Sequence, residues 1–394
     1  MTKAAAHAFD RRSALAFVIA LGIVSLFADA AYEGMRGISG PFLGALGASA
    51  AIVGIVAGTG ELAGYVLRLL SGRLAQRSGA YWPITIAGYA IQMAAVPVLA
   101  FAGSWQIAAL LIVLERTGKA VRNPAANTMM SHAGEEIGHG WAFGLHEALD
   151  QSGALAGPLI AALVLARHGS YREAFLWLGI PAVLTVGAVL AAAMRFPQAA
   201  RIPPGPAASA AGNLARPFWF YTAAAALMAF GSVDYPLIAF HFGKAHIVSP
   251  PLIPVFYAAA MAISGLSSVI FGRWFDAKGL KVMFAGFLTG AFAAPLLFLG
   301  GLPLALAGTL LWGAGLGVQG SVLSAAVAQM VPVHARANAF GVFTAIFGVA
   351  WFLGSSALGA LYEVSHLWLV ALSVVPQLVA LIPMWIAVRA SETA

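Results

Sequence analysis

Charged residues are scarce in this 394-residue sequence. Only 9% of the residues are charged, whereas soluble domains carry roughly 25%, and 61% are hydrophobic. A chain this apolar cannot cover a compact, water-exposed surface with polar groups. This composition excludes an ordinary soluble domain and indicates that lipid is the main solvent of the folded chain.

Three further absences exclude whole classes of chemistry. Without cysteine the chain can form neither disulfides nor thiolate metal sites. It contains no G-x-x-x-x-G-K-[S/T] phosphate-binding loop, so we do not expect it to couple ATP hydrolysis itself. No nucleophile–base arrangement is evident either, and we therefore expect no enzyme activity and no cofactor.

The basic residues and histidines indicate neither nucleic-acid binding nor metal binding. The net charge of +7 comes from basic residues that are dispersed between hydrophobic segments. His132, His139 and His146 recur at a spacing of seven residues. Because Gly134 and Gly138 should interrupt a helix between them, we expect no metal site.

Apolar stretches of about 20 residues, the length that crosses ~30 Å of hydrocarbon, recur along the whole sequence. They predict an all-α integral membrane protein with twelve transmembrane helices. We expect these helices at residues 13–35, 48–70, 81–101, 104–127, 140–166, 171–194, 217–241, 251–271, 282–300, 302–328, 338–362 and 366–388.

The basic residues predict how the helices are oriented. With the N-terminus in the cytoplasm, only Arg36, Arg167, Arg172 and Lys244 fall on external segments, and most other basic residues fall on cytoplasmic ones. This bias favours a multi-pass protein of a bacterial cytoplasmic membrane with both termini inside. The first apolar run resembles a cleavable signal peptide, but it is long, and we expect it to stay as the first helix.

Residues 196–216 form the only long polar interruption and contain four prolines, at positions 197, 203, 204 and 206. This composition predicts an irregular cytoplasmic linker. The linker separates an N-terminal six-helix bundle at 1–195 from a C-terminal six-helix bundle at 217–394.

A short sequence recurs at the same place in each half. Gly72-Arg73-Leu74-Ala75-Gln76-Arg77-Ser78-Gly79 follows the second predicted helix. Gly272-Arg273-Trp274-Phe275-Asp276-Ala277-Lys278-Gly279 follows the eighth, 200 residues later. This repetition indicates a duplicated six-helix unit.

Both turns resemble the G-x-L-A-D-R-x-G signature of the major facilitator superfamily of secondary transporters. The resemblance implies two six-helix bundles that rock around a central site, with the two turns acting as gates. Gln76 departs from the signature, which has aspartate there, whereas Asp276 keeps the acid. The gating residues implied are Gly72, Arg73, Arg77, Gly79, Gly272, Arg273, Asp276 and Gly279.

Two further motifs resemble bacterial efflux-like members of this superfamily. Gly153, Gly157 and Pro158 in the fifth helix match a G-x-x-x-G-P pattern that is enriched in exporters, and small residues there would allow close helix approach. The run from Arg116 to Ala125 resembles a subgroup that includes efflux and metal-tolerance permeases. Both motifs favour export.

Acidic residues inside the predicted helices carry the most functional information. An ionisable group at membrane depth costs roughly 2.5–3.5 kcal/mol on insertion scales, so each needs a partner or a water-filled cavity. Seven of the 14 acids lie in helices, and six of these seven are in the N-terminal half: Asp29, Glu33, Glu61, Glu115, Glu147, Asp150 and, in the C-terminal half, Asp234.

Two groups are candidates for proton coupling or substrate binding. Asp29, Glu33 and Arg36 share one face of the first helix, with Tyr32 beside them. His146, Glu147 and Asp150 crowd one patch of the fifth helix, where two close carboxylates cannot both ionise cheaply. Static charge pairing is the alternative for both groups.

The remaining polar residues of the helices have separate predicted roles. We expect Asp234, Tyr235 and Gln319 to line a substrate cavity together with Tyr32. Glu61 and Arg68 share a face of the second helix, and we expect a structural or gating pair. We expect three basic residues of the fourth helix, Arg116, Lys119 and Arg122, to lie near the cytoplasmic mouth.

The sequence therefore predicts a monomeric secondary active transporter that moves a small molecule by alternating access. Export in exchange for protons is the favoured mode. The alternatives are an importer or uniporter of a small organic anion, and a membrane sensor or assembly partner that has a transporter fold but transports nothing.

Overall fold

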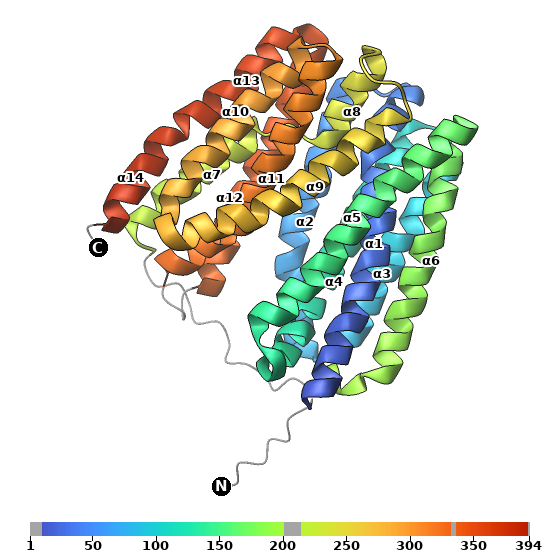
Figure 1. Cartoon of the computed structure of the whole chain (residues 1–394), viewed down its shortest axis with the longest axis vertical. Coiled ribbons are helices and arrows are strands. Elements are labelled where there is room, and N and C mark those ends of the chain that lie inside the picture. The colour runs from blue at the N-terminus through green and yellow to red at the C-terminus, as the bar shows by residue number, and fades with distance from the viewer. Residues whose placement is uncertain (1–9, 201–213, 332–335, 393–394) are drawn as a thin grey trace.

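The computed structural model describes residues 10–200, 214–331 and 336–392, and all regular structure within these ranges is helical (Figure 1). The α-helices are α1 (Arg11–Ala45), α2 (Ala50–Ser78), α3 (Tyr81–Val98), α4 (Trp105–Ile137), α5 (His139–His168), α6 (Tyr171–Arg195), α7 (Arg216–Gly231), α8 (Tyr235–Lys244), α9 (Leu252–Lys278), α10 (Met283–Leu299), α11 (Leu302–Met330), α12 (Arg336–Val364), α13 (His366–Val379) and α14 (Leu381–Glu392).

Ten helical segments of the described chain are long and apolar enough to cross a membrane. One of them joins α9 and α10 through a 3₁₀ turn, and α4, which carries four charged residues between positions 115 and 122, is not among the ten. The all-helical membrane fold is therefore confirmed. Twelve crossings and a cytoplasmic location for both termini stay predictions.

Several helices run further than the apolar stretches that predict them. α1 was expected to end at residue 35 but continues to Ala45, and α4 reaches Ile137 instead of residue 127. The expectation that Arg36 lies on an external segment was therefore wrong. Its side chain lies inside α1 and is largely buried, because acidic partners compensate its charge there.

The helices form two groups that repeat one packing pattern. In the first, α1 packs against α5 and α6, and α4 packs against α2 and α3. In the second, α7 packs against α12 and against α13 and α14, and α11 packs against α9 and α10. Figure 1 shows the two groups side by side, blue to green and yellow to red. The repeated pattern supports duplication, whereas most of the predicted linker, at 201–213, lies outside the described residues.

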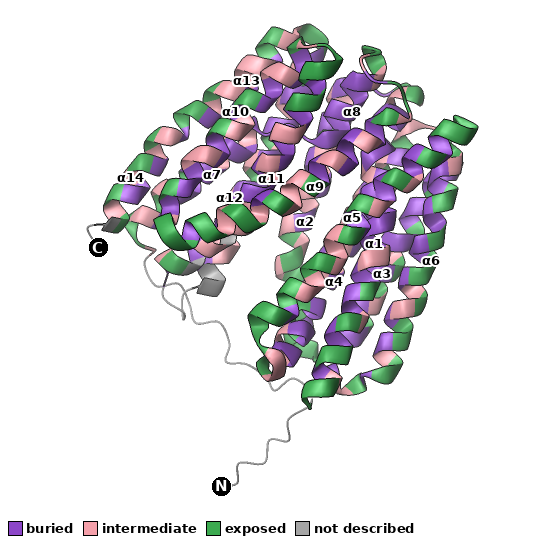
Figure 2. Ribbon diagram, in the orientation of Figure 1, coloured by how far each residue is buried: buried purple, intermediate pink, exposed green. Residues whose placement is uncertain are grey.

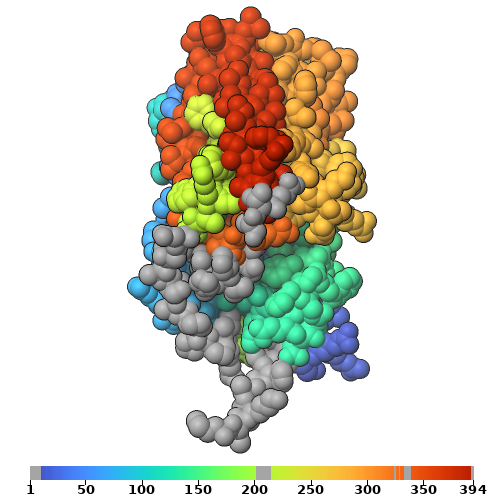
Figure 3. All heavy atoms as spheres, turned by 90° about the vertical axis from the view of Figure 1, so that its left-hand side faces the viewer, coloured from blue at the N-terminus to red at the C-terminus, as the bar shows by residue number. Residues whose placement is uncertain are grey.

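The two groups touch mainly near the end of the molecule where α1 finishes. There α2 packs along α12, α1 packs against α8, and α5 packs against α9. The Ala50 amide at the start of α2 donates a 2.7 Å hydrogen bond to Glu363 at the end of α12. Figure 3 shows the other end, where the α4 and α5 region in green projects below the helices of the second group.

Local sequence sets where the helices end and break. The repeated segments were expected to form turns after their helices, but residues 72–78 and 272–278 lie inside α2 and α9. Gly79 and Gly279, which directly follow these helices, have positive φ angles of 66° and 59°, a conformation that favours glycine. α7 and α8 are separated by Ser232, Val233 and Asp234, and Pro236 lies in the first turn of α8. At the first helix, hydrogen bonds from Ser13 lower the pKa of the Asp10 carboxyl below its usual value.

Burial follows the pattern expected of helices surrounded by lipid. Figure 2 shows buried positions where helices face each other and exposed positions on the outer faces. Many exposed side chains are large and apolar, such as Val183, which is 72% exposed, and Trp368, which is 65% exposed. Such a surface suits a hydrocarbon environment.

Candidate functional site

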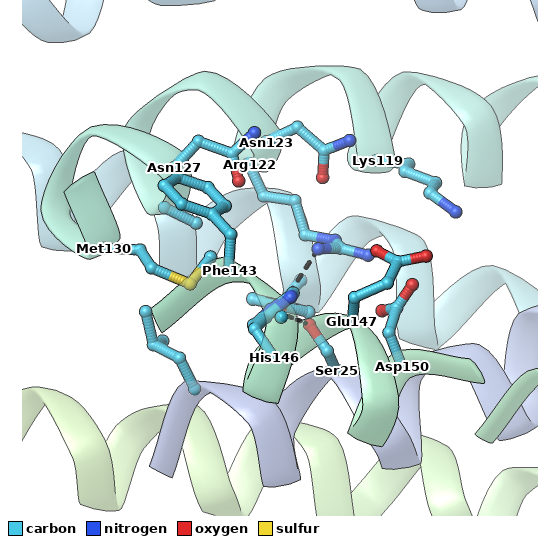
Figure 4. A pocket seen from close by; sticks show the side chains of 14 residues that line it. Ser25, Lys119, Arg122, Asn123, Asn127, Met130, Phe143, His146, Glu147 and Asp150 are labelled. Carbon is cyan, nitrogen blue, oxygen red and sulfur yellow. Dashed lines mark hydrogen bonds between the residues drawn. The ribbon is translucent and has the colours of Figure 1, made fainter. Parts of the chain in front are cut away.

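A cavity of about 500 Å³ opens between α1, α3, α4 and α5 (Figure 4). We call it the α4–α5 cavity. It lies nearer the start of α1 than its end, because Leu21 and Ser25 supply the α1 lining. The other lining residues are Tyr89, Lys119, Arg122, Asn123, Ala126, Asn127, Met130, Phe143, Gly144, His146, Glu147 and Asp150.

The wall that α4 contributes is basic. Two residues hold Arg122 in place. Its Nε donates a 2.7 Å hydrogen bond to Gln92 Oε1. Its Nη1 donates a 3.0 Å hydrogen bond to the Tyr89 hydroxyl, and its guanidinium lies over the Tyr89 ring. The Lys119 ammonium lies 4.0 Å from the centre of the Tyr32 ring. Within the described residues it has no hydrogen-bond acceptor.

The wall that α5 contributes is acidic. Glu147 accepts a 2.9 Å hydrogen bond from the Gln151 side chain, and His146 Nε2 lies 2.8 Å from the Ser25 hydroxyl. Asp150 lines the cavity without a hydrogen bond from any described residue. Figure 4 shows the carboxylates of Glu147 and Asp150 on the side of the cavity that faces Lys119 and Arg122.

Asp29 lies behind the basic wall. Its Oδ1 is 3.9 Å from Lys119 Nζ and 3.9 Å from Arg122 Nη2, distances that give attraction without a hydrogen bond. The Asp29 side chain is 5% exposed, and the same oxygen has no hydrogen-bond partner. Asp29 thus contributes to the electrostatics of the cavity without lining it.

A second group of charges, which we call the central ion-pair cluster, comprises Tyr32, Arg36, Glu61, Arg116 and Asp234. Glu61 Oε1 lies 2.9 Å from Arg116 and 3.5 Å from Arg36, and both guanidinium groups donate to the Tyr32 hydroxyl. Arg36 is seven residues beyond Asp29, which at 1.5 Å per residue places the cluster about 10 Å further along α1.

The central ion-pair cluster joins the two halves. Arg36 lies 3.8 Å from Asp234, which is the last residue of the break between α7 and α8. Asp234 also accepts hydrogen bonds from Trp351 Nε1, at 3.0 Å, and from the Ser355 hydroxyl, both on α12.

A further contact lies beside the cluster. The Tyr257 hydroxyl of α9 donates a 2.5 Å hydrogen bond to Glu33 of α1. The two halves are therefore held together by buried polar contacts at this level.

The structure corrects two expected arrangements. Glu61 pairs with Arg116 and Arg36, whereas the Arg68 guanidinium lies over the Tyr65 ring. The basic residues of α4 lie in the middle of a longer helix and not at its mouth, and Glu115 accepts a hydrogen bond from Gln92. Local spacing could not identify these partners, because they come from other helices.

The other predicted cavity residues lie apart from the α4–α5 cavity. The Tyr235 hydroxyl is buried and donates to the Ile253 carbonyl at 2.6 Å. Gln319 lines a small cavity among helices of the second half, together with Trp312 and Gln377. The structure does not bring Asp234, Tyr235 or Gln319 to the carboxylates of α5, and the roles of all predicted site residues stay predictions.

The glycines of the motifs lie where two helices of the same half pack against each other. Gly72 faces Pro124 of α4, and Gly272 faces Ser321 of α11, so the two repeated segments occupy equivalent positions. A side chain at Gly153 or Gly157 would collide with carbonyl groups of α1. These glycines therefore allow α1 and α5 to pack closely.

Sequence reasoning missed several polar residues of the site. Ser25, Tyr89 and Gln92 support the charged side chains, and Asn123 and Asn127 line the cavity. Two signals could have found them: Tyr89 with Gln92, and Asn123 with Asn127, share helix faces at spacings of three and four residues in apolar surroundings.

The fold and site define a class of protein, a multi-pass membrane protein with two helical halves and a polar cavity between helices. A sequence profile of the Major Facilitator Superfamily matches residues 13–355. The chain belongs to this superfamily and is a secondary transporter.

Uncharacterized proteins of Mycobacterium tuberculosis and Mycobacterium bovis are 38% identical to the chain over 389 residues, which covers 97% of this chain and 95% of theirs. These relatives share nearly the whole length of the chain.

Solved transporters share the fold at low sequence identity. The nucleoside transporter NupG has a TM-score of 0.69 at 14% identity, over 95% of this chain and 98% of its own. An inward-facing bacterial homologue of the human lysosomal transporter Spinster has a TM-score of 0.70 at 18% identity, over 94% and 96%. The peptide transporter POT has a TM-score of 0.75 at 13% identity, over 97% and 98%.

Proposed function

We propose that this transporter exports a small molecule from a bacterial cytoplasm in exchange for protons. One observation carries the proposal: Glu147 and Asp150 both line the α4–α5 cavity, and neither lies within 4.0 Å of a basic group of the described residues. If both were ionised, two negative charges would be left without an ion-pair partner inside the protein. Such charges are costly, so protons are the simplest compensation.

Asp150 and Glu147 are the proposed proton carriers. They line the α4–α5 cavity, and Asp150 has no hydrogen bond from a described residue. Lys119 and Arg122 of α4 line the same cavity as these two acids of α5. Asp29, Glu33 and Arg36 are proposed to relay the protonation state to the interface between the halves.

The arrangement of the two charge groups supports alternating access. The polar contacts of the central ion-pair cluster close one end of the interface, while the α4–α5 cavity lies toward the other end. With the N-terminus in the cytoplasm, this is an inward-facing state, like that of the Spinster homologue. We propose a monomer in the cytoplasmic membrane, in line with the bacterial relatives.

Proton coupling can be tested in proteoliposomes with a pH-sensitive dye. Cationic drugs, metal ions and small organic anions are added in turn, and proton movement is recorded. We expect at least one compound to move protons outward through the wild type and not through the Glu147→Gln/Asp150→Asn variant, because the variant has lost its carriers. The control is Glu173→Gln, at an exposed pair with His168.

Transport of the same compound without proton movement, or undiminished movement in the double variant, would contradict this assignment. Binding without any flux would favour the sensor or assembly role. An importer or uniporter of an organic anion is the second candidate, because Lys119 and Arg122 line the cavity. Uptake of the anion driven by an inward proton gradient would identify an importer, and uptake down its own gradient without proton movement would identify a uniporter.

A further inference from the structure

We propose that the α4–α5 cavity binds a small zwitterion that carries a protonated amine, an anionic group and an apolar substituent. The amine would pair with Asp150 and Glu147, and the anionic group with Lys119 and Arg122. This inference rests on the proposed function, since it names the substrate class of the same site.

The first argument is that charges of both signs line one cavity without neutralising each other. The Lys119 ammonium and the Asp150 carboxylate both line it, and neither has a hydrogen bond within the described part of the chain. No ion pair within 4.0 Å joins the described basic residues of α4 to those acids of α5. A ligand with both charges satisfies both walls, whereas a pure cation or a pure anion satisfies one.

The second argument is that the basic wall is held ready for an anion. Asp29 lies 3.9 Å from both basic groups, and its buried Oδ1 has no hydrogen-bond partner. Gln92 and Tyr89 occupy two of the Arg122 nitrogens and fix the guanidinium. The wall therefore keeps its position without using the donors of Lys119, which limits the entropy cost of binding an anion.

The third argument concerns the remaining lining. Asn123 and Asn127 offer amide groups beside the basic wall, and Leu21, Met130 and Phe143 offer an apolar surface. Figure 4 shows Met130 and Phe143 at the end of the cavity away from Lys119 and Asp150. A volume of about 500 Å³ lies within the range of roughly 300–1,000 Å³ that is typical of small-molecule sites.

Matched probes can test this charge selectivity on purified protein in detergent. The probes are phenylalanine, tryptophan and the dipeptide phenylalanylphenylalanine, each compared with its C-terminal amide, a cation, and its N-acetyl derivative, an anion. Binding is measured by calorimetry. We expect at least one free zwitterion to bind about tenfold or more tightly than both relatives, because each relative leaves one charged wall unpaired.

Two variants test which wall of the cavity binds which charge of the ligand. Lys119→Gln should remove the preference for the zwitterion over the amide, and Asp150→Asn should remove the preference over the N-acetyl compound. Lys278→Gln, at an exposed position near the end of α9, is the control and should keep both preferences. Selectivity is the readout, so a general loss of stability does not imitate the result.

Equal binding of all three charge forms, a preference for the amide or the N-acetyl compound, or no binding by any zwitterion of the panel would overturn the inference. The proton-coupling proposal fails separately. It would be contradicted if a zwitterion binds with the expected selectivity and is transported without moving protons. If another compound moves protons through the same carriers while no zwitterion of the panel binds, coupling stands and the zwitterion class is wrong.

Discussion

At the scale of single residues, Glu61 holds two arginines in one place. Its Oε1 is 2.9 Å from Arg116 and 3.5 Å from Arg36, and the side chain is 17% exposed. Tyr32 accepts from both guanidinium groups, but a neutral hydroxyl cannot balance two positive charges. The carboxylate of Glu61 therefore decides whether these arginines can stay close together in a poorly hydrated interior.

Replacing Glu61 by glutamine should destabilise the protein by about 3–5 kcal/mol, because it removes the carboxylate between two largely buried cations and breaks the 2.9 Å ion pair of Arg116. The measurement is the free energy of unfolding in detergent micelles. Glu173→Gln, which breaks an exposed pair with His168, should cost no more than about 1 kcal/mol. Equal effects of the two substitutions would show that the Glu61 contacts contribute little.

At the scale of elements, the contact between α2 and α12 depends on glycine. A side chain at Gly54 would collide with the Ser355 carbonyl, and Gly359 Cα would lie 3.1 Å from its Cβ. A side chain added at Gly58 would likewise be too close to Phe352, and one added at Gly348 would be too close to Tyr65. These positions let two helices from different halves approach closely at the closed end of the interface.

Replacing Gly54 by leucine should open this end of the interface, because the added side chain has no space there. A cysteine placed at Ser39 can report the change, since Ser39 is 1% exposed and lines a small cavity between the halves. The sequence has no other cysteine that would react. We expect an impermeant maleimide to label it several times faster in the Gly54→Leu background.

The matched control for this experiment is Gly64→Leu on the same helix, where an added side chain meets open space. It should leave the labelling rate of the Ser39→Cys protein unchanged. Equal acceleration by both substitutions, or by neither, would contradict a specific role for close packing at Gly54.

At the scale of the whole molecule, the ends of the helices define two sides. α1 begins, α6 ends and α7 begins on the side away from the main contacts between the halves (Figure 1). The distribution of basic residues predicts that this side is cytoplasmic. The direction of transport can be assigned only once this orientation is known.

Single cysteines can measure the orientation in intact cells. An impermeant maleimide should label Lys244→Cys and Arg167→Cys, on the predicted external side, in intact cells. It should label Arg77→Cys and Lys278→Cys only after the membrane has been permeabilised. All four positions are exposed in the structure. The reverse pattern would invert the topology and make the state described above outward-facing.

The sequence by itself determined the membrane fold, because the cost of burying polar groups in lipid acts on each segment separately. It predicted an all-helical chain, and it contains a repeated segment that ends with Gly79 in one half and with Gly279 in the other. Helix ends were less predictable, as α1 and α4 show, since a helix can continue beyond its apolar stretch when other helices pair its charges.

Only the tertiary structure decided which charges meet. Glu61 pairs with Arg116 and not with Arg68 in its own helix, and Asp29 lies behind Lys119 and Arg122 of α4. Arg36 reaches Asp234, almost 200 positions away along the chain. Such distances depend on how helices from different parts of the chain cross, and hydropathy and local spacing carry no information about that crossing.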